Sequence, residues 1–181
     1  MALLKFATVW LSGCSGCHMS FLDLDEWLID LAAQVDFVYS PFADIKEYPE
    51  GVDLVLVEGA VNNSDNWDFI HKVRERSKIL VSFGDCAVTG NVTALRNPWG
   101  SPETILQKSY IETADINPQI PQEPGIVPTL LNKVMPVHAV VNVDVYLPGC
   151  PPDAHRIRAA IEPLLRGEEP HLEGRELIKF G

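Results

Sequence analysis

Four cysteines are the residues of this sequence with the clearest capacity for chemistry. Cys14 and Cys17 stand together in Gly-Cys-Ser-Gly-Cys, Cys86 follows Gly-Asp, and Cys150 lies in Pro-Gly-Cys-Pro-Pro. Thiolates are the protein ligands of iron–sulfur clusters, and four of them complete the ligand set of a cubane. The short spacing from Cys14 to Cys17 lets one loop supply two ligands. The pattern predicts one [4Fe–4S] cluster, held by all four cysteines in an electron-transfer subunit.

Glycines accompany each of these cysteines. Glycine permits tight turns and a close approach of the backbone to a ligand. An anionic cluster also needs backbone N–H groups directed at its sulfurs, and glycine-rich turns supply them. We therefore expect four glycines to line the cofactor site, namely Gly13, Gly16, Gly84 and Gly149.

Three other interpretations of the cysteines stay open at this point. Cys14 and Cys17 could form a thioredoxin-like redox pair, but that leaves Cys86 and Cys150 unexplained. The four thiols could bind structural zinc, although ribbon-type zinc sites usually use two cysteine pairs and this chain has one. A single cysteine could also be a small buried apolar residue. Four of them in glycine-flanked turns favour the cluster.

Strands that alternate with helices must position these loops. Three cysteine motifs follow the first, fourth and fifth predicted strands, and the carboxyl ends of parallel strands meet at one ligand-binding edge. We predict an α/β fold with a flavodoxin-like, doubly wound, parallel five-stranded sheet and a long proline-rich insertion. Asp65 is the expected N-cap of the second helix, and Asp153 suits the start of the last. The predicted strands cover 5–11, 35–39, 52–57, 78–83 and 140–147, and the helices 17–33, 65–76, 86–95 and 153–165.

The segment 97–136 interrupts this alternation. It contains seven prolines, which cannot donate to a hydrogen-bonded ladder, so we expect no regular sheet within it. Long loops in compact domains are usually functional, and the segment is interpreted as a docking surface for a partner subunit. The chain then reads as a single iron–sulfur domain over 1–165, with 97–136 as an insertion, and a charged surface tail over 166–181.

Composition limits the classes of partner. The formal net charge is −11, which disfavours contact with phosphate backbones, so nucleic acid is not expected as a partner. No apolar run is long enough to span a bilayer. The apolar start lacks a basic leader and a cleavage site, and it is interpreted as a buried strand rather than a signal peptide. These features predict a cytoplasmic protein.

The motifs together resemble a known family, the small subunit of soluble, bidirectional NAD-reducing [NiFe]-hydrogenases. The matching stretches run from Trp10 to Glu26 through the paired cysteines, and over Val-Glu-Gly-Ala at 57–60, Gly-Asp-Cys at 84–86 and Pro-Gly-Cys-Pro-Pro at 148–152. The resemblance implies that the cysteines ligate the proximal [4Fe–4S] cluster. It also implies a Ni–Fe site in a separate large subunit, so this chain would hold no catalytic residue of its own. Diaphorase subunits with flavin and further clusters would reduce NAD+ in a reversible oxidation of H2.

Departures from related families narrow the resemblance. Periplasmic small subunits carry a twin-arginine leader and two further clusters, and this chain has neither the leader nor spare cysteines. The related subunit of respiratory complex I has adjacent cysteines in its first motif, whereas two residues separate Cys14 from Cys17. A complex I-like iron–sulfur subunit without hydrogenase activity stays the nearest alternative. A flavodoxin-like crevice could also bind FMN, but no residue pattern requires it.

Several other residues have two possible roles. Glu58, at the end of the third strand, is either a helix-capping or solvated carboxylate, or a carboxylate beside the cluster that relays protons or tunes the potential. His18 is expected to be a packed or surface residue, with a hydrogen bond to a cluster sulfur as the alternative. Arg156 is expected either near the start of the last helix or paired with a carboxylate of a partner.

Overall fold

A computed structural model describes residues 3–180 of the chain; residues 1, 2 and 181, which belong to the expected domain and tail, lie outside the described residues. Five strands form one sheet, in which every neighbouring pair is parallel. They are β1 (Leu4–Trp10), β2 (Val35–Tyr39), β3 (Val52–Glu58), β5 (Ser77–Phe83) and β7 (Val145–Leu147), in the order β2-β1-β3-β5-β7. Counted within the sheet alone, this is the 2-1-3-4-5 order of flavodoxin-like folds. The predicted doubly wound sheet is therefore confirmed.

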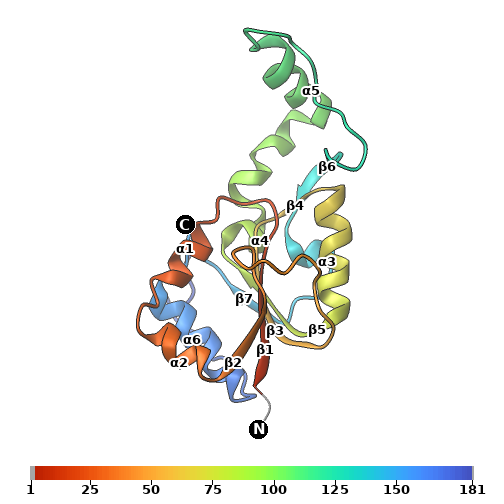
Figure 1. Cartoon of the computed structure of the whole chain (residues 1–181). Coiled ribbons are helices and arrows are strands. Elements are labelled where there is room, and N and C mark those ends of the chain that lie inside the picture. Colours follow the sequence, from red (N-terminus) through yellow and green to blue (C-terminus); the bar gives the residue numbers. More distant parts are fainter. Residues whose placement is uncertain (1–2, 181) are drawn as a thin grey trace.

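Helices cover both faces of the sheet (Figure 1). One face packs against α1 (Gly16–Leu22), α2 (Trp27–Ala32) and α6 (Ala154–Leu165) through a core that includes Phe6, Leu56 and Ile161. The other face packs against α3 (Ser64–Arg76) and α4 (Asp85–Thr89) around Val55 and Ile70. Burial on both faces explains why β3 and β5 read as nearly continuous apolar runs.

The helix predicted over 17–33 is two helices. Helix α1 ends at Leu22 and α2 begins at Trp27, and between them Asp25 takes a left-handed backbone conformation with φ of 50°. A left-handed residue cannot continue a right-handed helix. Leu24 and Trp27 still reach the same core on either side of the break, so the apolar spacing looked continuous in the sequence.

Two further boundaries were predicted wrongly. The last strand covers only Val145–Leu147 instead of 140–147. Val140 and Val141 lie in a turn after a short 3-10 helix, η3 (Val137–Ala139). From that turn they pack into the core around Val55 and Ile70, which gave them the apolar pattern of a strand. The helix predicted over 86–95 ends at Thr89, where Gly90 with φ of 88° closes α4, and a 3-10 helix, η1 (Asn91–Trp99), continues the chain.

The proline-rich segment is not free of sheet. Its last strand, β6 (Leu130–Met135), pairs antiparallel with β4 (Val61–Asn63) in a separate two-stranded sheet. The expectation failed because the seven prolines leave 129–135 uninterrupted, which is enough for a short strand. The rest includes α5 (Pro102–Gln107) and a π-helical turn, η2 (Lys108–Glu112), that extend away from the main sheet as an arm (Figure 1). Among the described residues, no helix is long and apolar enough to cross a membrane.

The start of α3 is capped by Asn63, not by Asp65. The Asn63 side-chain oxygen accepts a hydrogen bond of 2.8 Å from the backbone N–H of Asn66, two residues beyond the start of the helix. The side-chain oxygen of Asn66 in turn accepts a hydrogen bond from the Ser12 hydroxyl at 2.8 Å. The helix start is therefore tied to the loop that leads to the first cysteine.

Replacing Asn63 with alanine should lower the free energy of unfolding of the full chain by about 1 kcal/mol, because one N–H group at the helix start loses its acceptor. Asp65→Ala is the matched control, and it should cost less because Asp65 offers a charge near the helix N-terminus and accepts one long bond, of 3.4 Å, from the Ser64 hydroxyl. Chemical denaturation followed by circular dichroism measures both. An equal or larger loss for Asp65→Ala would contradict the capping role of Asn63.

Candidate functional site

Backbone hydrogen bonds join the loop after β1 to the loop after β3. The N–H of Leu11 donates to the carbonyl of Glu58 at 2.8 Å, and Ser12 and Ala60 exchange two bonds of 2.8 and 3.1 Å. Gly59 makes this contact possible, because a Cβ built on it would lie 2.9 Å from backbone atoms of Ser12. The loop that carries Cys14 and Cys17 is thus held against the end of β3.

The loops after β5 and β7 are joined in the same way. The N–H of Gly84 donates to the carbonyl of Leu147 at 2.8 Å, and the N–H of Asp85 donates to the carbonyl of Gly149 at 2.9 Å. The buried carboxylate of Asp85 accepts a bond of 2.6 Å from the N–H of Gly149. Asp85 therefore positions the loop that leads to Cys150. This role of Asp85 was not predicted from the sequence, although its position directly before Cys86 indicated that it lies in the cysteine loop.

The two pairs of loops meet where the predicted ligands lie. A Cβ built on Gly84 would lie 2.1 Å from the sulfur of Cys17, so the backbone after β5 touches the thiol after β1. A Cβ on Gly16 would lie 3.2 Å from the sulfur of Cys14. Cys17 and Cys86 are buried, whereas Cys14 and Cys150 are exposed. The four thiols thus share one edge of the sheet, with two facing inward and two facing solvent.

The four thiols lie close enough to influence one another's ionisation. Burial raises the pKa of Cys17 far above its usual range, and the carboxylate of Glu58 and the other three thiols raise it further. Burial also raises the pKa of Cys86, as do the neighbouring Cys14 and Cys150. Crowded thiols in a partly dry site cannot all ionise unless a positive centre joins them. The arrangement favours a ligand that supplies such charge.

The donor set fits an iron–sulfur cluster. Among residues 3–180, no group of three or more His, Cys, Asp or Glu side chains is close enough to hold a single metal ion. The fit therefore rests on the chemistry of the site. Four free thiols are available, Gly84 places no side chain against the Cys17 sulfur, and backbone N–H groups are directed at sulfur. The backbone N–H of Gly16 donates to the Cys14 sulfur at 3.4 Å. Thiolate ligands and N–H donors to sulfur are the features that cluster sites require.

Gly13 and Gly149 lie close to this edge without a contact to sulfur of their own. A Cβ on Gly13 would lie 3.2 Å from the Cα of Gly59 and 3.5 Å from a Glu58 carboxylate oxygen. A Cβ on Gly149 would lie 2.5 Å from the Cα of Pro152. Backbone packing therefore requires a glycine at position 149, and Gly13 leaves room for the close approach of Gly59.

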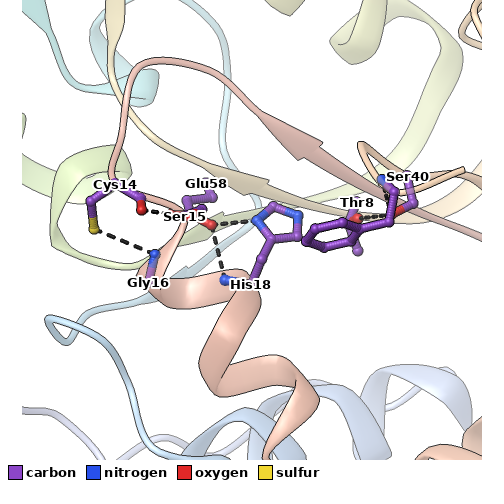
Figure 2. Close-up of polar contacts among 8 residues, drawn as sticks. Thr8, Cys14, Ser15, Gly16, His18, Ser40 and Glu58 are labelled. Atoms are coloured by element: carbon purple, nitrogen blue, oxygen red, sulfur yellow. Dashed lines mark hydrogen bonds and ion pairs between the residues drawn. The ribbon is translucent and has the colours of Figure 1, made fainter.

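Glu58 is buried beneath the first cysteine loop, and the expected solvated carboxylate is wrong. One of its oxygens accepts a hydrogen bond of 2.9 Å from the backbone N–H of His18, at the start of α1, and also pairs with the His18 ring nitrogen Nδ1. Figure 2 shows His18 turned toward Glu58, with Cys14 and Gly16 at the same helix start. Glu58 caps α1, as one of the two expectations proposed, and it also raises the pKa of Cys17.

His18 is a packed residue, as expected. Its ring lies between Phe42 and Phe83, with centroids 5.7 and 6.4 Å away, and its Nε2 is buried without a hydrogen-bond partner among the described residues. The ring also lines a cavity of about 250 Å³ together with the hydroxyl-bearing Thr8 and Ser40. The pairing of Nδ1 with Glu58 fixes the ring orientation, and that orientation turns Nε2 away from Cys14 (Figure 2).

Arg156 does not reach outward to a partner. Its side chain is buried and donates to the carbonyl of Pro148, which stands two residues before Cys150. It also donates to the carbonyls of Leu177 and Lys179, each at 3.0 Å. The predicted pairing with a partner did not consider that a guanidinium has several N–H donors. Here these donors join the last cysteine loop to the C-terminal tail. Asp153 caps α6 as expected, with a 3.0 Å bond from the N–H of Arg156.

The sheet order and the thiol-bearing loops at its carboxyl edge define a class, the flavodoxin-like domains whose functional loops lie at the ends of their parallel strands. Residues 14–164 match the family described as the 20 kDa subunit of NADH ubiquinone oxidoreductase. The chain belongs to this family. The resemblance to small subunits of NAD-reducing [NiFe]-hydrogenases is confirmed by the relatives and structures below.

Several hydrogenase subunits are similar to this chain in sequence. The chain is 39% identical over 168 residues to the NAD-reducing hydrogenase HoxS subunit delta of Cupriavidus necator, covering 91% of this chain and 79% of that protein. It is 38% identical over 184 residues to a subunit of the F420-non-reducing hydrogenase of Methanothermobacter marburgensis, with 97% of this chain matched. The chain spans only 58% of the length of that second relative.

One solved structure supports the same relationship, and a more distant one shares the fold. A crystal structure of an NAD+-reducing [NiFe]-hydrogenase in the H2-reduced state has a chain with a TM-score of 0.93 and 38% identity, covering 99% of this chain and 100% of that one. A Ni-Fe-Se hydrogenase from Desulfomicrobium baculatum shares the fold, with a TM-score of 0.57 and 17% identity over 95% of this chain and 68% of that one.

If the four thiols hold an iron–sulfur cluster, Gly84→Ala should lower its iron content, because the new methyl group would lie 2.1 Å from the Cys17 sulfur and force the two loops apart. Gly100→Ala is the matched control: Gly100 has a similar φ of 87°, but nothing lies within 4 Å of its Cβ position. The control should lose about 1–2 kcal/mol of stability from backbone strain and keep its iron. Iron and acid-labile sulfide per chain, assayed after anaerobic purification, measure the difference. Full iron content in Gly84→Ala would contradict the close packing of the two loops.

Proposed function

We propose that this chain is the electron-transfer small subunit of a cytoplasmic NAD-reducing [NiFe]-hydrogenase. One observation carries the proposal: four thiols from three distant loops share one sheet edge in a chain that superimposes, over nearly its whole length, on a chain of an NAD+-reducing [NiFe]-hydrogenase. A relative from Archaeoglobus profundus, 31% identical over 185 residues, is named as an iron-sulfur subunit of an F420-non-reducing hydrogenase. We infer that Cys14, Cys17, Cys86 and Cys150 hold one [4Fe–4S] cluster.

When bound, the cluster supplies one-electron transfer, and the chain supplies the environment for it. The inward-facing Cys17 and Cys86 would fix the cofactor against the sheet and exclude water there. The exposed Cys14 and Cys150 would face the neighbouring subunits. A cluster with one side in protein and one side open can pass electrons to a partner that docks against the open side. The arrangement therefore suits a subunit that works within an assembly.

The proposed partners follow from the same assignment. A large subunit would hold the Ni–Fe site at which H2 reacts, and diaphorase subunits with flavin and further clusters would reduce NAD+. This chain would connect the two centres and would hold no catalytic residue of its own. FMN is not assigned to the chain, since the cysteines gather at the edge where a flavodoxin-like fold would receive it.

Anaerobic purification of the chain with its co-expressed partners tests the proposal. The expected preparation is brown, includes a nickel-binding large subunit, and contains about four iron and four sulfide beyond those that the partners hold, as one cubane requires. Cys86→Ser should lose about four iron per assembly, whereas Thr89→Ser, a conservative change at the end of the same helix, should keep them. A colourless preparation with zinc would support a structural zinc protein instead. An iron–sulfur preparation without any nickel-binding partner would favour a complex I-like subunit.

A second experiment tests the role of Glu58. Glu58→Gln removes a negative charge beside Cys17 while keeping the shape of the side chain, so the reduction potential of the cluster should become more positive. Glu50→Gln is the matched control: it lies near the opposite end of β3, where its exposed carboxylate pairs with Arg76. Redox titration followed by electron paramagnetic resonance, together with H2 oxidation rates, measures both variants. If neither quantity changes in Glu58→Gln, Glu58 acts only as a cap for α1.

A further inference from the structure

The turn that begins η1 carries an asparagine that neither the motifs nor the proposed ligand set includes. Asn91 follows Gly90, which ends α4, and takes a backbone φ of 32°. Positive φ is uncommon for residues other than glycine, and asparagine is among the few that tolerate it. Strained positions of this kind concentrate where a side chain has a function.

The strained backbone directs the Asn91 side chain at a predicted ligand. Its amide nitrogen, Nδ2, donates to the sulfur of Cys150 at 3.3 Å, across 59 residues of sequence. The next two residues direct their backbone N–H groups at another sulfur, since Val92 and Thr93 hydrogen-bond to Cys86. The turn thus presents donors to one inward-facing and one outward-facing thiol.

The helix that follows holds this turn in place. Arg96, three residues after Thr93, donates from its guanidinium to the side-chain oxygen of Asn62 at 2.8 Å and to the carbonyl of Leu131 at 2.7 Å. Asn97 exchanges two bonds with the backbone of Val134, at 2.8 and 2.9 Å. These bonds join η1 to β4 and β6. They therefore hold the N–H donors at the start of η1 in position.

We propose, building on the iron–sulfur assignment above, that Asn91 sets the reduction potential of the cluster through its hydrogen bond to Cys150. Reduction by one electron adds one negative charge, which the ligand sulfurs share, and no bond of the chain forms or breaks. An amide N–H directed at a sulfur stabilises the more negative, reduced form more than the oxidised form. Asn91 therefore makes the cluster easier to reduce than the four thiolates alone would.

Two substitutions separate the amide from the backbone conformation. Asn91→Gly removes the donor and suits a positive φ, while Asn91→Asp keeps the shape and replaces the donor by an acceptor with a negative charge. Asn117→Asp is the matched control, because Asn117 also has a positive φ, of 49°, and lies exposed in the segment after η2. The control adds the same charge without a contact to sulfur.

The experiment uses the full chain in its anaerobically purified assembly. The midpoint potential of the cluster is measured by redox titration with electron paramagnetic resonance, alongside iron per chain. We expect both substitutions of Asn91 to shift the potential to more negative values with iron retained, the aspartate variant more than the glycine variant, and Asn117→Asp to match the wild type. Deuterium exchange should also remove a proton hyperfine coupling from the reduced wild-type cluster that Asn91→Gly lacks.

Other outcomes overturn the inference. A wild-type potential in Asn91→Gly, or a shift in Asn91→Asp no larger than that in Asn117→Asp, would show that the amide does not tune the cluster. Loss of iron from both Asn91 variants would show that the amide holds Cys150 in place instead. A wild-type assembly without iron and sulfide would refute the proposed function itself, whereas an iron-loaded assembly with unshifted variants would refute only the role of Asn91.

Discussion

The backbone hydrogen bonds between neighbouring loops are the constraint on which the rest of the site depends. One set joins the loops after β1 and β3, through Ser12 and Ala60, and another joins the loops after β5 and β7, through Asp85 and Gly149. Parallel strands bring their carboxyl ends to one edge, but the edge alone would leave the loops free to point apart. The paired loops give that edge a defined shape. Gly59 allows the close approach within the first pair, and Gly84 allows the two pairs to approach each other.

Charge is the second constraint, and it explains why the four thiols favour a positively charged ligand. Burial and mutual repulsion raise the pKa of Cys17 and Cys86, so the thiols resist ionisation together. A proposed cluster would supply the compensating iron and release protons as it binds, which couples loading to the stability of the folded loops. Glu58 adds negative charge close to Cys17, yet it also caps α1 through the N–H of His18. The same carboxylate thus links the geometry of the first cysteine loop to its electrostatics.

The sequence predicted the sheet and the convergence of the cysteine loops well, because buried parallel strands and glycine–cysteine turns leave strong local patterns. The apolar pattern predicted a strand wrongly where residues outside helices and strands pack into the core, as Val140 and Val141 do. It also failed where one residue breaks a helix, as Asp25 does. The partners of Arg156, Asp85 and Asn91 lie in other loops or far along the chain, so only the fold could reveal them.

Arg156 joins the carbonyl of Pro148 to those of Leu177 and Lys179. During synthesis a chain folds from its N-terminal end, but this guanidinium cannot complete its contacts until residue 179 has emerged from the ribosome. The segment before Cys150 therefore gains this support only after the residues around Lys179 have been synthesised. The shape of the last cysteine loop depends on a part of the chain that is made well after Cys150 itself.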